Sequence, residues 1–249
     1  MSVIDGTKPT IIYALPCYEP ATCMWSNAAK VIIPRELADK PINYVILYGS
    51  ASTPEVIHDA MKKPDVKMLK GVGHGAPPRF TTTDNRTVYS TEDPQGLEEL
   101  RGKNFSPVSC LVGLELLPTM EKHGLGAGLG ETKEYIITSG AINSFVYSEL
   151  SYDLWLIRGA THKEAYEAML RKYEAEARQR ELMGDVYAAR LLRYDAKYRA
   201  KFGHDDWKLI ETPTPPQPPQ PPTPPSGRVK VTITIPETTL EGWITWEQQ

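Results

Sequence analysis

"VKMLKGVGHGAPPRF", residues 66–80, decides the fold that we expect for this chain. It begins as a short apolar run and ends with a histidine between two glycines, Gly73 and Gly75. A short and nearly continuous apolar run is typical of a strand in a parallel sheet that is covered on both faces. Glycine permits close approach of the backbone, which a buried structural histidine seldom needs on both sides. We therefore predict a strand whose carboxyl end presents His74 to a cleft.

Other apolar runs of the same kind alternate with segments of helical pattern. The predicted strands lie at 9–17, 41–50, 105–111 and 133–140, besides the one that ends at His74. The predicted helices lie at about 21–38, 54–63 and 114–123, and in a longer region at about 149–202 that contains a capping box at 161–164. Alternation of strands and helices predicts right-handed crossovers and an α/β sandwich with a mostly parallel sheet.

A proline-rich stretch divides the chain. Residues 212–227, "TPTPPQPPQPPTPPSG", predict an extended polyproline spacer, because proline lacks an N–H and has a fixed φ. Residues 1–211 precede this spacer as one domain, and a tail at 228–249 follows it. The tail alternates at period two, which predicts a β-hairpin. Since so short a hairpin buries little core, we expect it to dock on the main domain or on a protein partner.

The overall composition narrows the class of protein. The chain has 249 residues with a formal net charge of −3, which favours neither a nucleic-acid partner nor a membrane surface. The first residues lack a secretory signal pattern, and no apolar run approaches the roughly 20 residues of a membrane helix. The 3 cysteines are an odd number, which argues against a disulfide framework. We therefore expect a reduced, cytoplasmic protein.

Two reactive residue types follow consecutive predicted strands. In an open α/β sheet the carboxyl ends of the strands meet at one edge, where ligands bind. His74 and Cys110 both lie at such ends, and a helix is expected a few residues after Cys110. A cysteine thiolate is a nucleophile whose pKa falls near an imidazolium or a helix N-terminus, and histidine transfers protons near neutral pH. The N–H groups of Gly75 and Cys110 are suited to hold a developing oxyanion.

Each of these residues also has a structural interpretation. A lone cysteine after an apolar run is usually a small buried hydrophobe. The glycines of "GLGAGLG" (124–130) follow a predicted helix and are expected to form its stop and a flexible turn. His58, His162 and His204 have no partners at metal-ligand spacing, so we expect them at the surface. We predict neither a metal nor an organic cofactor.

A family resemblance supports the catalytic interpretation. The ordered segments "GVGHGAPPRFT", "VYSTED" and "LRGKNFSPVSCLVGLELLPTMEKHG" resemble prokaryotic members of clan CD, the caspase, gingipain and clostripain class of cysteine peptidases. The resemblance covers about 9–150, and "GDVYAARLLRYDAKYRAKFGHDDW" resembles the tails of such proteins. It implies a caspase-like three-layer αβα sandwich and a cysteine endopeptidase that forms an acyl-enzyme. By the resemblance, Cys110 is the nucleophile, His74 the general base or proton carrier, and Gly75 part of the oxyanion hole.

The resemblance also implies where a polypeptide substrate binds. Family members with charged specificity build the pocket from the loops after the first and fifth strands. Glu19 in the first loop would meet a basic P1 side chain, and Ser139 and Gly140 in the other loop would line the pocket. Two alternatives stay open: a catalytically silent caspase-like module that serves assembly or signalling, and another α/β hydrolase or transferase with a chance His-Gly pair.

Overall fold

The computed structural model describes residues 8–210, 228–235 and 238–245, and the chain divides into two units, residues 1–211 and 212–249. The first unit is built on a six-stranded sheet with the order β2-β1-β3-β7-β8-β9. Its five leading strands are parallel, and only β9 runs antiparallel to its neighbour. The strands are β1 (Thr10–Leu15), β2 (Asn43–Tyr48), β3 (Val66–Gly71), β7 (Asn104–Phe105), β8 (Ala127–Glu131) and β9 (Arg199–Gly203).

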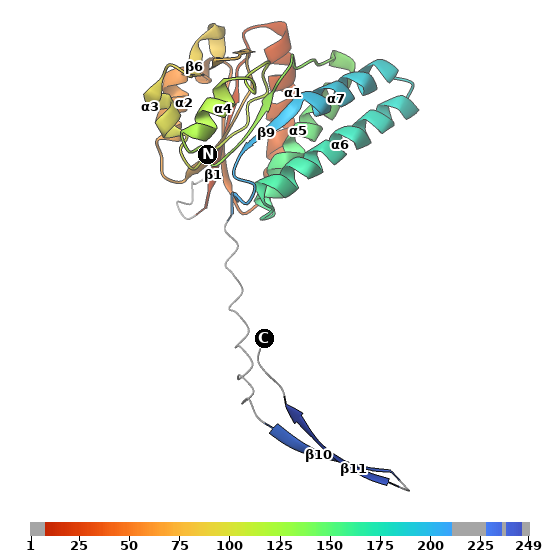
Figure 1. Cartoon of the computed structure of the whole chain (residues 1–249). Coiled ribbons are helices and arrows are strands. Elements are labelled where there is room, and N and C mark those ends of the chain that lie inside the picture. The colour runs from red at the N-terminus through yellow and green to blue at the C-terminus, as the bar shows by residue number, and fades with distance from the viewer. Residues whose placement is uncertain (1–7, 211–227, 236–237, 246–249) are drawn as a thin grey trace. The chain divides into compact units, whose positions relative to one another are not determined.

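Helices cover both faces of this sheet (Figure 1). They are α1 (Pro20–Leu37), α2 (Pro54–Met61), α3 (Pro94–Glu99), α4 (Leu116–Lys122), α5 (Ile142–Ile157), α6 (His162–Leu182) and α7 (Val186–Tyr198). Alternate residues of β1 belong to two separate cores. Tyr13 lies in the core with α1, α5, α6 and α7, whereas Ile12 lies in the core with α2, α3 and α4. Every residue of β1 is buried, as a central strand between two helical layers requires. The expected αβα sandwich with a mostly parallel sheet is confirmed.

The fifth parallel strand is not where the sequence places it. β8 occupies Ala127–Glu131, which overlaps the stretch at 124–130 expected to be a helix stop and a flexible turn, and residues 133–140 form no strand. The glycines explain the difference. A Cβ at Gly130 would lie 2.2 Å from Leu117 Cδ1, so α4 packs directly on a strand without side chains at that point. Glycine is depleted in strands in general, and here the tight packing of α4 overrides that preference.

Other predicted elements are shorter or more divided than expected. The strand predicted at 105–111 is reduced to β7, with a further parallel bridge between Val72 and Val108. The long helical region divides into α5, α6 and α7, and the capping box of Thr161 and Glu164 begins α6 as predicted. β9 follows directly after α7 and closes the sheet at its antiparallel edge.

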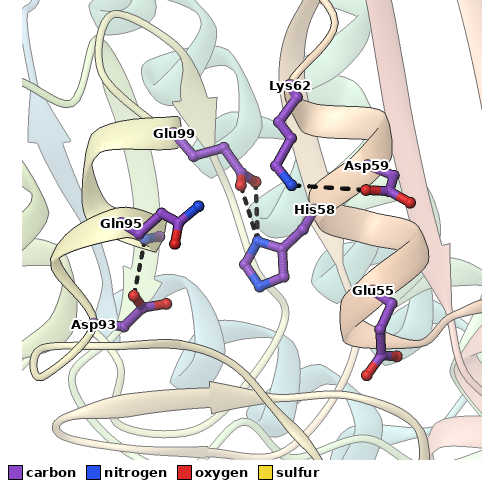
Figure 2. Close-up of a pocket in the computed structure, with 8 residues that line it drawn as sticks. Glu55, His58, Asp59, Lys62, Asp93, Gln95 and Glu99 are labelled. Carbon is purple, nitrogen blue, oxygen red and sulfur yellow. Dashed lines mark hydrogen bonds and ion pairs between the residues drawn. The ribbon is translucent and has the colours of Figure 1, made fainter.

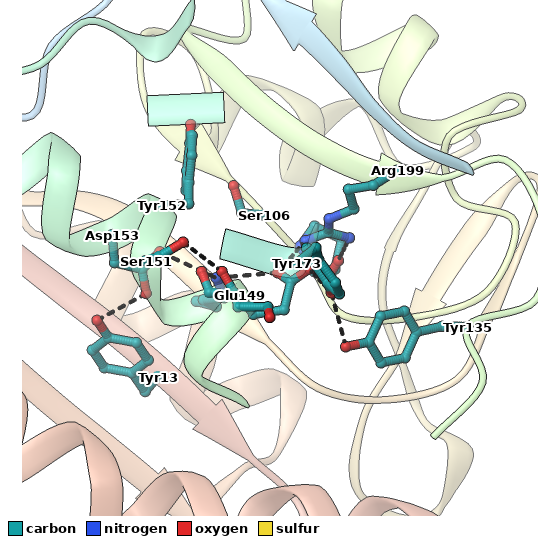
Figure 3. A network of polar contacts seen from close by, with 12 residues as sticks. Tyr13, Ser106, Tyr135, Glu149, Ser151, Tyr152, Asp153, Tyr173 and Arg199 are labelled. Atoms are coloured by element: carbon teal, nitrogen blue, oxygen red, sulfur yellow. Dashed lines mark hydrogen bonds and ion pairs between the residues drawn. The ribbon is translucent and has the colours of Figure 1, made fainter. Parts of the chain in front are cut away.

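A buried ionic network lies beneath the carboxyl ends of the strands (Figure 3). Glu149 of α5 accepts a hydrogen bond from Arg199 at 2.8 Å and lies 3.3 Å from Lys70 Nζ. Lys70 also donates to Asp153 at 3.1 Å, and Arg199 lies 3.4 Å from Glu131. All five side chains are buried. A buried charge is tolerated only when it has partners. The partners here come from different elements, so the network links β3, β8, β9 and α5.

In the second unit, β10 (Arg228–Ile235) and β11 (Thr238–Thr245) form an antiparallel pair. Arg228 lies opposite Thr245, and Ile235 lies opposite Thr238. These are the segments for which the alternating pattern predicts a hairpin. The predicted spacer at 212–227 lies outside the described residues. Among the helices that the structure describes, none combines the length and the apolar character that a membrane crossing requires.

Candidate active site

His74 follows β3 in a loop that leads into a small three-stranded antiparallel sheet. This sheet consists of β4 (Gly75–Ala76), β5 (Arg79–Thr81) and β6 (Thr87–Ser90). A Cβ at Gly73 would lie 1.9 Å from the carbonyl oxygen of Thr81, and a Cβ at Gly75 would lie 2.1 Å from that of Cys110. The glycines therefore do permit close approach, and the segments that approach are the chain's own backbone. Gly75 brings the histidine loop against the cysteine.

Cys110 lies in a sharp turn between the Val72–Val108 bridge and α4. Its side chain is half-buried, and its Sγ accepts a hydrogen bond from the N–H of Tyr135 at 3.3 Å. Leu111 follows with a φ of 63°, a left-handed conformation that a leucine rarely adopts. Such backbone strain costs about 1–3 kcal/mol and concentrates at functional sites. Within residues 8–210 no backbone carbonyl accepts a hydrogen bond from the Cys110 N–H.

The lowering of the Cys110 pKa expected from an imidazolium or a helix N-terminus is not found. The helix expected after Cys110 is present as α4, which begins at Leu116 after a bend and turn at 111–115. Burial raises the pKa of the Cys110 thiol, the N–H of Tyr135 opposes that shift, and the carboxyl groups of Glu134, Glu131 and Asp195 add to it. In this arrangement the thiol holds its proton, so a reaction at sulfur requires a base.

His74 and Cys110 line the same pocket, which has a volume of about 110 Å³ and also contains Glu19. Glu19 Oε1 lies 2.7 Å from His74 Nε2. Oε1 is buried and makes no hydrogen bond with the described residues, so the contact is a close approach of a carboxylate oxygen to the ring nitrogen. The imidazole is partly exposed, with 45% of the side-chain surface accessible. A histidine with a carboxylate against it therefore shares the pocket with the half-buried thiol.

Ser139 and Gly140 do not line this pocket. They are exposed, and the Gly140 carbonyl accepts a hydrogen bond from Arg180 at 3.0 Å. The same loop contributes other residues that the sequence analysis did not single out, Tyr135 and Ile137. The sequence signal for these residues is the apolar pattern "YII" at 135–137, which predicts part of a strand rather than a pocket wall. Trp25 of α1 also lines the pocket.

Cys17 and Cys23 form a disulfide, so the expectation that the cysteines are all reduced is wrong. An odd number of cysteines is compatible with one disulfide and one free thiol, and the free thiol here is Cys110. The bridge joins the loop after β1 to the first turn of α1 and encloses Glu19. Disulfides persist mainly in oxidising compartments, so the bridge removes one reason for a cytoplasmic location, which stays a prediction.

The loop that contacts Cys110 is itself tied to the buried interior. The N–H of Ile136 donates to Asp195 Oδ1 at 3.1 Å. The hydroxyls of Tyr135 and Tyr173 lie 3.2 Å apart, and Tyr173 donates to Glu149 at 2.8 Å. Figure 3 shows Tyr135, Tyr173 and Glu149 in this order. These bonds connect the loop that carries the Tyr135 N–H to the buried ionic network.

His162 is a further correction, because it is fully buried rather than at the surface. Its Nδ1 lies 2.6 Å from the Tyr152 hydroxyl, and its Nε2 donates to the Phe202 carbonyl at 2.9 Å. Burial lowers the pKa of His162 to about 4, so the ring is neutral. Its neutral ring and its two partners indicate a structural role at the start of α6.

A larger pocket lies between α2 and α3 (Figure 2). It has a volume of about 430 Å³ and is lined by Glu55, His58, Asp59, Lys62, Asp93, Gln95, Gly96 and Glu99. His58 Nδ1 lies 2.9 Å from Glu99 Oε2, and this contact raises the pKa of His58. The lining contains no thiol or hydroxyl nucleophile, and the described part of the chain contains no cluster of three metal-ligating side chains. The smaller pocket at Cys110 is therefore the candidate active site.

No family model and no curated protein matches this chain. Among solved structures it is similar to the Arg-specific cysteine proteinase gingipain R, with a TM-score of 0.50 and 13% identity over 80% of this chain and 47% of that one. It is also similar to the complex of the Porphyromonas gingivalis RgpB pro- and mature domains, with a TM-score of 0.50 and 15% identity over 82% and 48%. The chain thus spans about half the length of these structures. At such identities the likeness shows the fold alone, a caspase/gingipain-like α/β sandwich that agrees with the fold expected from the sequence.

Proposed function

We propose that this protein is a cysteine-type endopeptidase in which Cys110 is the nucleophile and His74 the base. The observation that carries the proposal is the shared pocket of these two residues, with Glu19 2.7 Å from His74. The half-exposed positions of both side chains support it, because a nucleophile and its base must reach the substrate. The clan CD-like fold supports the same reaction class, as an analogy.

The reaction follows from the groups present. His74 removes the Cys110 proton, and Sγ attacks the scissile carbonyl carbon, whose π electrons move to oxygen. The N–H groups of Cys110 and Gly75 are proposed to hold this oxyanion. The C–N bond then breaks, and the leaving amine takes the proton from His74. Water next attacks the thioester with His74 as base, which releases the carboxylic acid and restores the thiol. Glu19 stabilises the imidazolium in both steps.

The proposal is tested by peptide hydrolysis with the full chain and two variants. Cys110→Ala should remove turnover, and His74→Ala should reduce kcat/KM by about 10²–10⁴, the usual contribution of a general base. Circular dichroism checks that both variants fold. Turnover that survives in Cys110→Ala would contradict the proposal. A folded wild-type chain that neither hydrolyses peptides nor reacts at Cys110 would favour the catalytically silent module instead.

A further inference from the structure

The pocket at Cys110 also carries information about the substrate, provided that the proposed function holds. Besides the reacting groups, its walls are formed mainly by apolar side chains from three separate parts of the chain. Trp25 comes from α1, Val72 and Val108 from the bridged strand ends, and Ile137 from the loop after β8. Trp25, Val72 and Val108 are buried, so they form its inner wall. Thr22 and Ser109 also line the pocket, so a side chain that enters from Cys110 contacts mainly hydrocarbon and these two hydroxyl-bearing residues.

Four ionisable side chains line the pocket. They are Glu19, His74, Cys110 and Tyr135. Glu19 lies against His74 at 2.7 Å, and the Tyr135 hydroxyl is 3.2 Å from that of Tyr173 in the buried network. Glu134, Glu131 and Asp195 lie close enough to influence the thiol but do not line the pocket. An ammonium or guanidinium in this pocket would have to share Glu19 with His74, because the lining contains no other carboxylate.

The size of the pocket limits the occupant to one residue. Its volume of about 110 Å³ is well below the roughly 300–1,000 Å³ of pockets that hold whole drug-sized ligands. We propose that it is the pocket for the P1 side chain, the residue whose carbonyl is attacked, and that it selects an uncharged, apolar side chain. In this arrangement Glu19 serves His74 and does not recognise a basic P1 residue. This differs from the preference for arginine or lysine expected from the sequence.

The test compares fluorogenic peptides that differ only at P1. With the full chain, kcat/KM for P1 leucine, methionine or alanine should exceed that for arginine, lysine or aspartate by about 10-fold or more. That range corresponds to the one or two kcal/mol that a hydrophobic pocket gains from a fitting side chain. A higher kcat/KM for arginine or lysine would overturn the inference and leave the proposed function intact. No hydrolysis of any peptide, together with no reaction at Cys110, would remove the proposed function itself.

Two variants at Ile137 test whether this pocket causes the preference for an apolar P1 side chain. Ile137→Asp places a carboxylate in the lining, and Ile137→Asn is its uncharged control of the same shape. The ratio of kcat/KM for P1 arginine to that for P1 leucine should rise about 10-fold or more in Ile137→Asp relative to Ile137→Asn. Equal ratios would show that P1 binds elsewhere and would overturn the inference. Glu19→Gln should lower kcat/KM by the same factor for every P1 residue, whereas a loss confined to basic P1 residues would contradict the assignment.

Discussion

At the scale of single residues, the contact between Glu19 and His74 matters most for the proposed chemistry. In the proposed reaction the carboxylate stabilises the imidazolium beside Nε2, and the other ring nitrogen exchanges the proton with Cys110 or substrate. A base that is neither oriented nor stabilised loses part of its catalytic contribution, even when its own side chain is intact. Glu19 is thus a positioning residue, and its effect must pass through His74.

Glu19→Gln should therefore lower kcat/KM by about 10-fold or more, because an amide cannot stabilise the imidazolium as a carboxylate does. Glu115→Gln is the matched control, since Glu115 is exposed and lies outside the pocket lining. Peptide hydrolysis measures both variants, and thermal unfolding checks that each is folded. An unchanged kcat/KM in folded Glu19→Gln would show that the contact between Glu19 and His74 plays no part in the reaction.

Gly75 is the second decisive residue, because its missing side chain lets two strand ends meet. Gly75→Ala would place a Cβ 2.1 Å from the Cys110 carbonyl oxygen, whereas the same change at Gly140 meets nothing within 4 Å. We expect Gly75→Ala to lower the free energy of unfolding by about 1–3 kcal/mol, as overpacking does, and to slow alkylation of Cys110. Gly140→Ala should stay within about 0.5 kcal/mol of wild type. Urea unfolding measures both, and equal stabilities would contradict the close approach.

At the scale of elements, the loop between β8 and α5 connects the buried network to the nucleophile. The N–H of Ile136 is held by Asp195 of α7, and burial raises the pKa of Asp195 to about 9. The folded protein therefore holds a proton that the unfolded chain releases near its ordinary pKa of 3.8. Linkage then requires that this carboxyl makes the protein less stable as the pH rises between these values.

Asp195→Asn tests this linkage, because asparagine keeps an oxygen acceptor for the Ile136 N–H and cannot ionise. The free energy of unfolding of wild type minus that of Asp195→Asn should fall as the pH rises from 5.5 to 8.5, by at most about 1.4 kcal/mol per pH unit. Urea unfolding at three pH values measures the difference. A difference that is constant or grows with pH would show that Asp195 is ionised in the folded protein.

The loop after β1 is the second element with a testable constraint. Its disulfide joins cysteines six positions apart and encloses Glu19. Closing so short a loop stabilises the folded state by about 2 kcal/mol in the chain-entropy model. The free energy of unfolding should therefore fall by about 2 kcal/mol in the double variant Cys17→Ser, Cys23→Ser, and also in the reduced wild type. Stability that is insensitive to a reductant, with mass spectrometry showing both thiols free, would contradict a structural bridge.

The sequence predicted the elements whose signals are local. α1, α2, β1, β2 and β3 lie within one to three residues of their predicted ranges, because apolar runs and proline at helix starts carry that information. β8 was missed because its glycines are explained only by the distant α4. Glu19 was identified as a candidate, but its contact with His74 depends on how the loops fold and on a disulfide that cysteine counting argued against.

At the scale of the whole molecule, a parallel sheet brings residues 36 positions apart to one pocket. The sequence predicted this juxtaposition from topology alone, since the carboxyl ends of neighbouring strands share one edge. It did not predict the apolar lining, which comes from α1 and from a loop that it assigned to a strand. That the tail at 228–249 docks on a domain or partner stays a prediction.

The most direct measurement of the central claim is the intact mass of the protein after reaction with a peptidyl acyloxymethyl ketone, an electrophile that alkylates nucleophilic cysteines. Cys110 is the free cysteine, since the other two are joined. We predict one adduct on the wild type, mapped to Cys110 by peptide sequencing, none on Cys110→Ala, and a much slower reaction in His74→Ala. Equal labelling of Cys110→Ala, or a wild-type rate unaffected by loss of His74, would contradict a catalytic pair.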